Sequence, residues 1–301
     1  MAENKDTSSR RKTLDELMEF ALVRADRARE AAENKAAETP RALFLPGMDE
    51  FVRAMPNHIA RSSLFAPVAR GHRKLHDGTI LQSRGDAEIR FSGKQLDEAQ
   101  ADVWMQAMKE AQRQPLGKPV VINRTNFLRA IGRTKGGENY KWLHRTMQDL
   151  TFAMLVIEIT KADGKPKLFI GRTRALHLIA SFDYDENSEQ YTLTIDPRWH
   201  ALYGNREFAL IDWEKRREFG RNQDMAKTLQ RLVATSSNPV QRYALDWLKA
   251  KMEYSGRLRD FRDALARACA ELERLEIITA HKIEDSTKGK PQLAMWLQPL
   301  A

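Results

Sequence analysis

A group of basic residues in the middle of the chain has the chemistry to bind a polyanion. Between residues 113 and 145 there is one acid, Glu138, against eight lysines and arginines: Arg113, Lys118, Arg124, Arg129, Arg133, Lys135, Lys141 and Arg145. Guanidinium and ammonium groups donate hydrogen bonds to phosphate oxygens and to acceptors on base edges. This local excess of positive charge favours a nucleic-acid partner.

The stretch "ENYKWLHRTMQDL" at the end of this group has the period of a helix. Tyr140, Leu143, Met147 and Leu150 recur at spacings of three, four and three, which predicts a narrow buried face. A single α-helix fits the major groove of DNA, so we interpret this segment as a recognition helix rather than a solvated amphipathic face. The residues expected to point outward to DNA are Asn139, Lys141, His144, Arg145 and Gln148.

Two further basic groups lie beyond this helix. A hairpin predicted around the turn "KADGKPK" is expected to contact phosphates beside the groove, which positions a protein without specifying sequence. Its basic residues are Lys161, Lys165, Lys167, Arg172 and Arg174. A later helix begins with Arg257, Arg259 and Arg262, where recognition helices commonly meet bases, although acids alternate with them.

The residue patterns of common enzymes are missing. The seven histidines form no His-x-His or His-Glu-x-x-His pattern, and there is neither a phosphate-binding G-x-x-x-x-G-K-[ST] loop nor a G-x-G-x-x-G fingerprint. The lone Cys269 excludes an intrachain disulfide and a cysteine-cluster zinc site. We therefore expect no enzyme activity, no catalytic residues, no metal and no cofactor. A nuclease or primase is disfavoured by the missing metal ligands.

The elements that must position the basic residues follow the order of a winged helix-turn-helix. After the strand "AEIRFSG" we expect a helix over 96–114, a short strand "KPVVIN", two helices on either side of Gly132, and a hairpin over 151–182. The stretch "EQYTLTIDP" adds another strand. The hairpin with the basic turn is expected to be the wing.

The same organisation recurs in the second half without sequence identity. Three helices are predicted within 225–275, followed by a hairpin around "EDSTKGKP". The predicted fold class is α+β, with two tandem winged-helix domains behind a flexible or helical N-terminal extension. The expected boundaries are 1–40 for the extension, 41–85 for a docked connector, 86–205 for domain 1 and 206–301 for domain 2.

The connector contains "RAMPNHIARSSLFAP", which is too interrupted for one helix and too apolar for a plain linker. Pro56 and Pro67 each disfavour helix at the preceding residue, so the segment is expected to dock through Leu64 and Phe65. Its arginines would lie against a polyanion or a neighbouring domain.

Bulk composition fits this interpretation. The 301 residues carry a formal net charge of +9, and their length suffices for two domains. The N-terminus "MAENKDTSSRRK" has no apolar segment of a signal peptide, and no long apolar run follows. We expect a cytoplasmic protein with no membrane partner.

Four blocks of residues resemble the TrfA-type plasmid replication initiators. They are "RAMPNHIARSSLFAPVARGHR", "NYKWLHRTMQDLTFAML", "IDWEKRREF" and "GRLRDFRDALARACAELERLEII", and together they extend the resemblance over about residues 42–283. The resemblance implies tandem winged helices that bind repeated origin sites, called iterons, in double-stranded plasmid DNA. It also implies help in melting an adjacent AT-rich segment, with contact to the exposed single strand.

The resemblance further implies recruitment of the host helicase and sliding clamp, and an equilibrium between dimer and monomer. In the family a clamp-binding peptide that begins with glutamine lies just before the Met-Pro-Asn block. Here "RALFLP" keeps Leu43 and Phe44 as partner-binding residues but lacks the glutamine. The alternative function is a sequence-specific transcriptional repressor with the same domains.

Overall fold

The computed structural model describes residues 22–30, 42–68, 71, 73–84, 86–161, 163–171, 174–204 and 207–297. The chain separates into two compact units, Met1–Arg41 and Ala42–Ala301, which are considered separately. In the first unit, residues 22–30 form a helix. The rest of the predicted extension lies outside the described residues.

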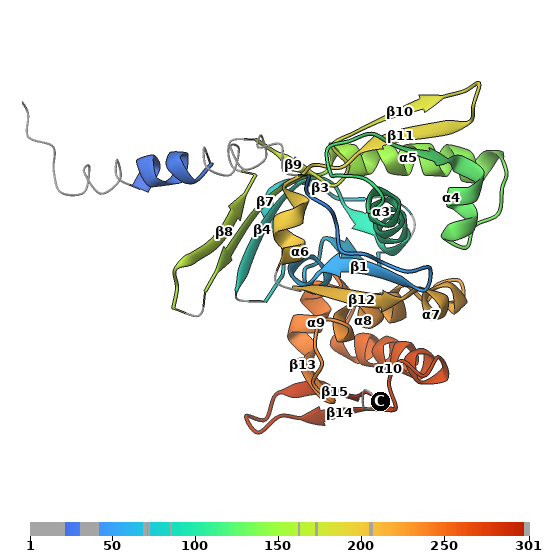
Figure 1. The fold of residues 1–301 in the computed structure, drawn as a ribbon. Coiled ribbons are helices and arrows are strands. Elements are labelled where there is room, and N and C mark those ends of the chain that lie inside the picture. Colours follow the sequence, from blue (N-terminus) through green and yellow to red (C-terminus); the bar gives the residue numbers. More distant parts are fainter. Residues whose placement is uncertain are drawn as a thin grey trace, which may run out of the picture. The chain divides into compact units, whose positions relative to one another are not determined.

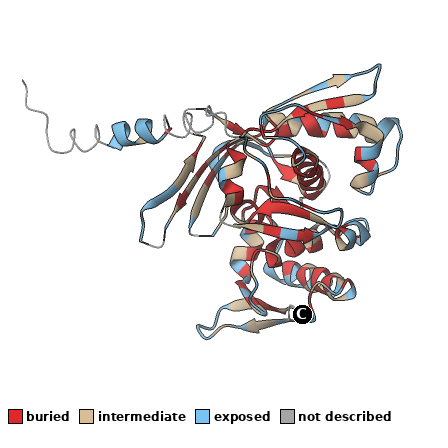
Figure 2. Cartoon of the chain, viewed as in Figure 1, coloured by how far each residue is buried: buried red, intermediate tan, exposed pale blue. Residues whose placement is uncertain are grey.

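The unit Ala42–Ala301 is a mixed α+β structure, as predicted, and it contains two hydrophobic cores. The first core gathers side chains between Leu45 and Trp213, and the second gathers side chains between Phe219 and Met295. In Figure 2 the buried residues run through the helices that face each core, while the hairpin turns are exposed. Each core is therefore built on its own stretch of chain.

The basic helix belongs to a series of six elements in the first half. The series is α3 (Glu98–Ala111), β6 (Val120–Asn123), α4 (Arg124–Ala130), α5 (Gly137–Phe152), β10 (Ser181–Asp185) and β11 (Gln190–Thr194) (Figure 1). Its strands form an antiparallel sheet in the order β10-β11-β6. Asp97 and Gln100 make a capping box at the start of α3, and the Asn123 side chain caps α4.

The second half repeats this series. Its elements are α8 (Asp224–Val233), β13 (Val240–Ala244), α9 (Leu245–Lys251), α10 (Leu258–Arg274), β14 (Ala280–Asp285) and β15 (Pro291–Trp296). The strand order is β13-β15-β14, so the first strand of each series pairs with the last. The predicted repeat of architecture is thus present in element order and in strand pairing.

An insertion separates α5 from β10 in the first half. It comprises β7 (Met154–Thr160), β8 (Pro166–Ile170) and β9 (Leu176–His177), which join β3 (Leu75–Ile80) and β4 (Ala87–Lys94) in a five-stranded sheet. The prediction that the 151–182 hairpin is the wing of the first unit is wrong, because β7 pairs with β4 and the hairpin on the α5 sheet is β10–β11. Alternating hydrophobicity marks a strand but not its partner.

The connector is docked through short elements. They are β1 (Val52–Pro56), α2 (Asn57–Arg61) and β2 (Phe65–Ala66), which pack with elements from later in the chain. Those elements are β5 (Leu96–Asp97), α6 (Trp199–Tyr203), β12 (Phe208–Asp212) and α7 (Trp213–Glu218). β1 pairs with β12, and β2 pairs with β5. Leu64 and Phe65 are fully buried, which confirms them as anchors. The boundaries at residues 40, 85 and 205 remain a prediction.

Candidate nucleic-acid interface

Both helix pairs turn by the same local geometry. After α4, Gly132 adopts a positive φ of 73° and the Arg133 amide donates to the Leu128 carbonyl at 2.8 Å. After α9, Glu253 adopts a φ of 49° and the Tyr254 amide donates to the Lys249 carbonyl at 3.0 Å. These bonds satisfy carbonyls that a helix end leaves free. Each turn therefore sends a second, longer helix, α5 or α10, away at a defined angle.

An exposed stripe runs along α5. Lys141, Arg145 and Gln148 are exposed, while Leu143 and Met147 are fully buried on the opposite side. Lys141 lies 3.4 Å from Glu138, but both side chains are mostly in solvent, and such a pair contributes little. Arg145 and Gln148 make no side-chain hydrogen bond or ion pair with the described residues. Three of the five predicted contacts on this helix are therefore available to a ligand.

Asn139 is half-buried and its side chain is engaged, whereas the prediction that His144 points outward is wrong. The Asn139 side chain donates to the Thr134 carbonyl at 2.8 Å and braces the turn. His144 packs among the aromatic rings of the β10–β11 hairpin, with its ring centroid 5.5 Å from that of Phe182 and 6.1 Å from that of Tyr191. The apolar spacing of α5 could not show that the hairpin covers this side.

Two arginines of the basic group between residues 113 and 145 belong to the framework. Arg124 lies 3.8 Å from the ring centroid of Tyr140, and it bonds Glu189 and Tyr184 on the hairpin. Arg133 stacks at 3.5 Å on Trp142. Cation–π stacking fixes guanidinium groups in place. Arg124 thereby joins α4, α5 and the β10–β11 hairpin.

The second half presents a denser group of free cations. Arg257 stands at the N-cap position of α10, and Arg259 and Arg262 follow on its outer side, opposite the buried Phe261 and Leu265. All three arginines are exposed, and their side chains make no hydrogen bond or ion pair with the described residues. They are placed as the sequence predicts.

The two hairpins beside these helices differ in charge. The β10–β11 turn is acidic: Ser188 and the Asn187 amide bond the Asp185 carboxylate and lower its pKa. Glu186 and Glu189 add two negative charges there. The β14–β15 turn instead carries the exposed Lys288 and Lys290, which sequence reasoning passed over although they stand in the turn after α10.

The predicted basic residues of the 151–182 hairpin lie elsewhere. Lys165 is exposed on the β7–β8 turn and lies 3.8 Å from Asp163, and Lys167 bonds Glu207. Arg172 lies outside the described residues. Because β7 and β8 belong to the five-stranded sheet, these lysines do not flank α5 as a wing would.

The predicted partner residues lie at the start of Ala42–Ala301. Phe44 has 48% of its side-chain surface exposed, between Leu43, which is half-buried, and Leu45, which is buried. The Leu43 carbonyl accepts a hydrogen bond from the Leu116 amide at 2.7 Å. The backbone here is held in place while the phenyl ring remains accessible.

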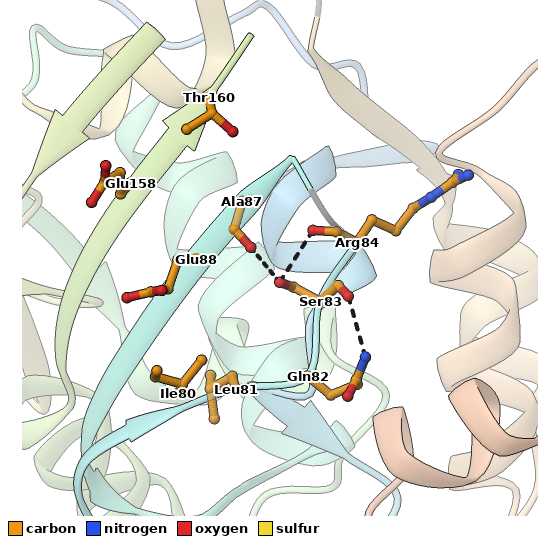
Figure 3. Close-up of a pocket in the computed structure, with 9 residues that line it drawn as sticks. All are labelled: Ile80, Leu81, Gln82, Ser83, Arg84, Ala87, Glu88, Glu158 and Thr160. Atoms are coloured by element: carbon orange, nitrogen blue, oxygen red, sulfur yellow. Dashed lines mark hydrogen bonds between the residues drawn. The ribbon is translucent and has the colours of Figure 1, made fainter. Parts of the chain in front are cut away.

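A pocket lies on the five-stranded sheet rather than beside α5 or α10. Figure 3 shows its lining, where Ser83 donates to the Ala87 carbonyl and the carboxylates of Glu88 and Glu158 stand on adjacent strands. Neither histidine nor cysteine lines it. Within the described ranges there is no group of three side chains arranged to hold a metal ion. In the same residues no helix is both long and apolar enough to span a bilayer.

Comparison with known proteins agrees with this arrangement. The chain is 23% identical over 278 residues to the plasmid replication initiator protein TrfA of Escherichia coli, covering 88% of this chain and 69% of that protein. Two crystal structures of domains 2 and 3 of RctB share the fold, with TM-scores of 0.52 and 0.50 at 14% identity. They cover 82% and 80% of this chain, and 99% and 97% of their own. The model of the TrfA protein family matches residues 38–288, and the chain belongs to that family.

Proposed function

We propose that this protein is a plasmid replication initiator that binds repeated sites in origin DNA through two winged-helix units. The observation that carries the proposal is the repeated series of elements, in which each half places exposed cations on the helix that follows the turn. The relationship to a plasmid replication initiator supports the same function. The order of elements and the strand pairing in each series support the winged-helix assignment.

In this proposal α5 and α10 enter the major groove. Four side chains would bond base edges or phosphates, because they make no hydrogen bond or ion pair with the described residues. They are Arg145 and Gln148 on α5, and Arg257 and Arg259 on α10. Lys288 and Lys290 would contact the phosphate backbone beside α10. The work of the protein is binding rather than catalysis, so no catalytic group is required.

Several bound copies would share the cost of distorting the duplex. Bending or unstacking DNA costs several kcal/mol, on the order of 1–6 for a smooth bend over one site. Tandem iterons beside an AT-rich segment would supply those copies, and the opened single strand would be a further ligand. The exposed Phe44 is our candidate contact for the sliding clamp, with the helicase and a second copy of the chain as further partners.

The test is selection of bound duplexes from random DNA at near-physiological salt, followed by footprinting of the selected sites. Salt suppresses non-specific phosphate binding, so enriched sequences report base recognition. Directly repeated sites of about two helical turns each would support the initiator. A single palindrome would favour a transcriptional repressor, and no enrichment would contradict both.

A further inference from the structure

The contact between the two halves of Ala42–Ala301 is built from buried charges. Glu98 and Asp102 lie on α3 of the first half, and they face cations from α7 and α8. Glu98 and its partners Arg216 and Arg231 are each at most 1% exposed. Charged side chains are rarely buried completely unless they are paired, so a fully buried ionic cluster at this position requires an explanation.

The geometry of this cluster is directional. Arg216 donates from one guanidinium nitrogen to Glu98 at 2.7 Å and from another to Asp102 at 2.7 Å. Arg231 bonds both oxygens of Glu98 and donates to the Phe65 carbonyl at 2.9 Å. Burial alone would raise the pKa of Glu98, but Arg231 and Arg216 hold it at about 2. The Glu98 carboxylate is therefore charged, and both of its oxygens are held by hydrogen bonds from arginines.

A second set of contacts reaches the helix-turn-helix of the second half itself. Lys251, at the end of α9, is fully buried and donates to the carbonyls of Ala60 at 3.0 Å and Ser62 at 2.6 Å. Glu253, the residue of positive φ in the turn before α10, accepts from Lys74 at 3.2 Å and from Gln95. The turn that aims α10 is thus bonded to the first half.

A matching contact ties α5 to the same helix that carries Glu98. Gln100 on α3 donates to Asp149 on α5 at 2.8 Å. A continuous path of directional bonds therefore runs from α5 through α3 to α7 and α8, while Lys251 and Glu253 fix the turn before α10. Apolar surfaces can slide or rotate against each other at small cost, whereas fully bonded buried charges permit one arrangement.

We propose that the buried Glu98 cluster fixes the angle between α5 and α10, and so sets the one helical phase between two half-sites that the protein accepts. The inference rests on the proposed function, because it assumes that both helices contact the same duplex. Glu98 and Arg216 are positioning residues in this sense. The ligand is then a pair of half-sites with fixed spacing rather than two independent sites.

The experiment measures affinity for duplexes whose half-sites, located by footprinting, are either unchanged or moved apart by about five base pairs, which is half a helical turn. Losing the second contact removes the gain from linked binding, so the full-length protein should bind the shifted duplex on the order of 10²-fold more weakly. The measured quantity is the ratio of the two affinities.

Glu98→Gln should lower this ratio to about tenfold or less, because the linked gain depends on how well the joint geometry matches the sites. Affinity for the unchanged duplex falls while affinity for the shifted duplex changes little. Ile157→Ala is the matched control, since Ile157 is fully buried in the first core on β7, away from the contact. It should destabilise the protein and leave the ratio unaltered.

If Glu98→Gln does not fold, a second variant tests the same inference. Glu253→Asn keeps a residue that tolerates positive φ but removes the reach to Lys74 and Gln95, and a smaller fall of the ratio is expected. A wild-type protein that binds both duplexes equally, or variants that keep the wild-type ratio, would overturn the inference. Failure of the wild type to bind either duplex would instead count against the proposed function.

Discussion

The two helix-turn-helix units share a backbone plan but distribute charge differently. In the first unit, Arg124 and Arg133 are stacked on aromatic rings, and the adjoining hairpin is acidic. In the second unit, three arginines at the start of α10 are free and the turn of the adjoining hairpin presents the exposed Lys288 and Lys290. The number of basic residues in a segment therefore does not by itself measure its attraction for phosphate. The second unit should supply more of the salt-dependent affinity.

The largest expected effect concerns the buried Glu98 cluster, which joins the two units. The pKa of Glu98 is lowered to about 2 by Arg231 and Arg216 against the effect of burial. A depressed carboxyl pKa stabilises the fold above the unfolded value near 4.5 and loses that contribution as pH falls toward 2. On this basis acid should remove on the order of 3 kcal/mol of unfolding free energy. Denaturant unfolding at pH 7, 4 and 2 measures it.

Glu98→Gln provides the check on that pH dependence. The variant should be less stable than wild type at pH 7, and the difference should narrow on acidification because the wild type loses its charge. A constant difference between pH 7 and pH 2 would contradict the role given to the ionised carboxylate. Ile157→Ala, which removes no charge, should show a difference that does not depend on pH.

A direct comparison of the recognition helices comes next in size. The double variant Arg257→Ala and Arg262→Ala should weaken binding by about 2–4 kcal/mol and reduce the slope of log affinity against log salt by about two. Arg145→Ala should cost about 1–3 kcal/mol and reduce the slope by about one. Titrations at several salt concentrations measure both. Equal slopes for the two variants would contradict the claim that the second unit supplies more of the salt-dependent affinity.

Substitutions in the two hairpins should change DNA affinity by smaller amounts and in opposite directions. Lys288→Gln removes a cation beside α10 and should reduce the salt slope by about one, weakening binding to all sequences alike. Glu186→Gln removes an exposed carboxylate from the β10–β11 turn and should strengthen binding slightly, since one repulsion is lost. If both substitutions weaken DNA binding, Glu186 does not repel the DNA, and the acidic turn contributes to binding through an interaction other than charge attraction.

The smallest effect is expected from the framework of the first unit. Arg124→Gln removes the stack on Tyr140 and the bond to Glu189, and should lower the unfolding free energy by about 0.5–2 kcal/mol. Lys118→Gln is the matched control, because Lys118 is an exposed cation without a side-chain partner among the described residues. Thermal unfolding of both variants decides whether Arg124 acts through structure or through charge.

Local signals in the sequence predicted the helices and the repeat. The break between helices at Gly132 and the apolar spacing of α5 each depend on neighbouring residues, and each was confirmed. Burial of Leu64 and Phe65 also followed from their setting between two prolines.

Features that depend on distant partners were not predictable in this way. The pairing of β7 with β4 displaced the expected wing, and the hairpin over His144 turned an expected ligand into a packing residue. The buried Glu98 gave no signal either, since a carboxylate early in an amphipathic helix is ordinarily in solvent. Its partners are more than a hundred residues away.

The pairing of β1 with β12 has a consequence for how the chain folds. Val52 lies opposite Asp212, so the first core closes only after the intervening chain has been ordered. Every strand pair of the second core lies within residues 240–296. Folding rates fall as the sequence separation of native contacts grows. During synthesis the first core cannot close until the chain has been made as far as Asp212. The second core is synthesised last, but its strands pair over short separations and should form faster.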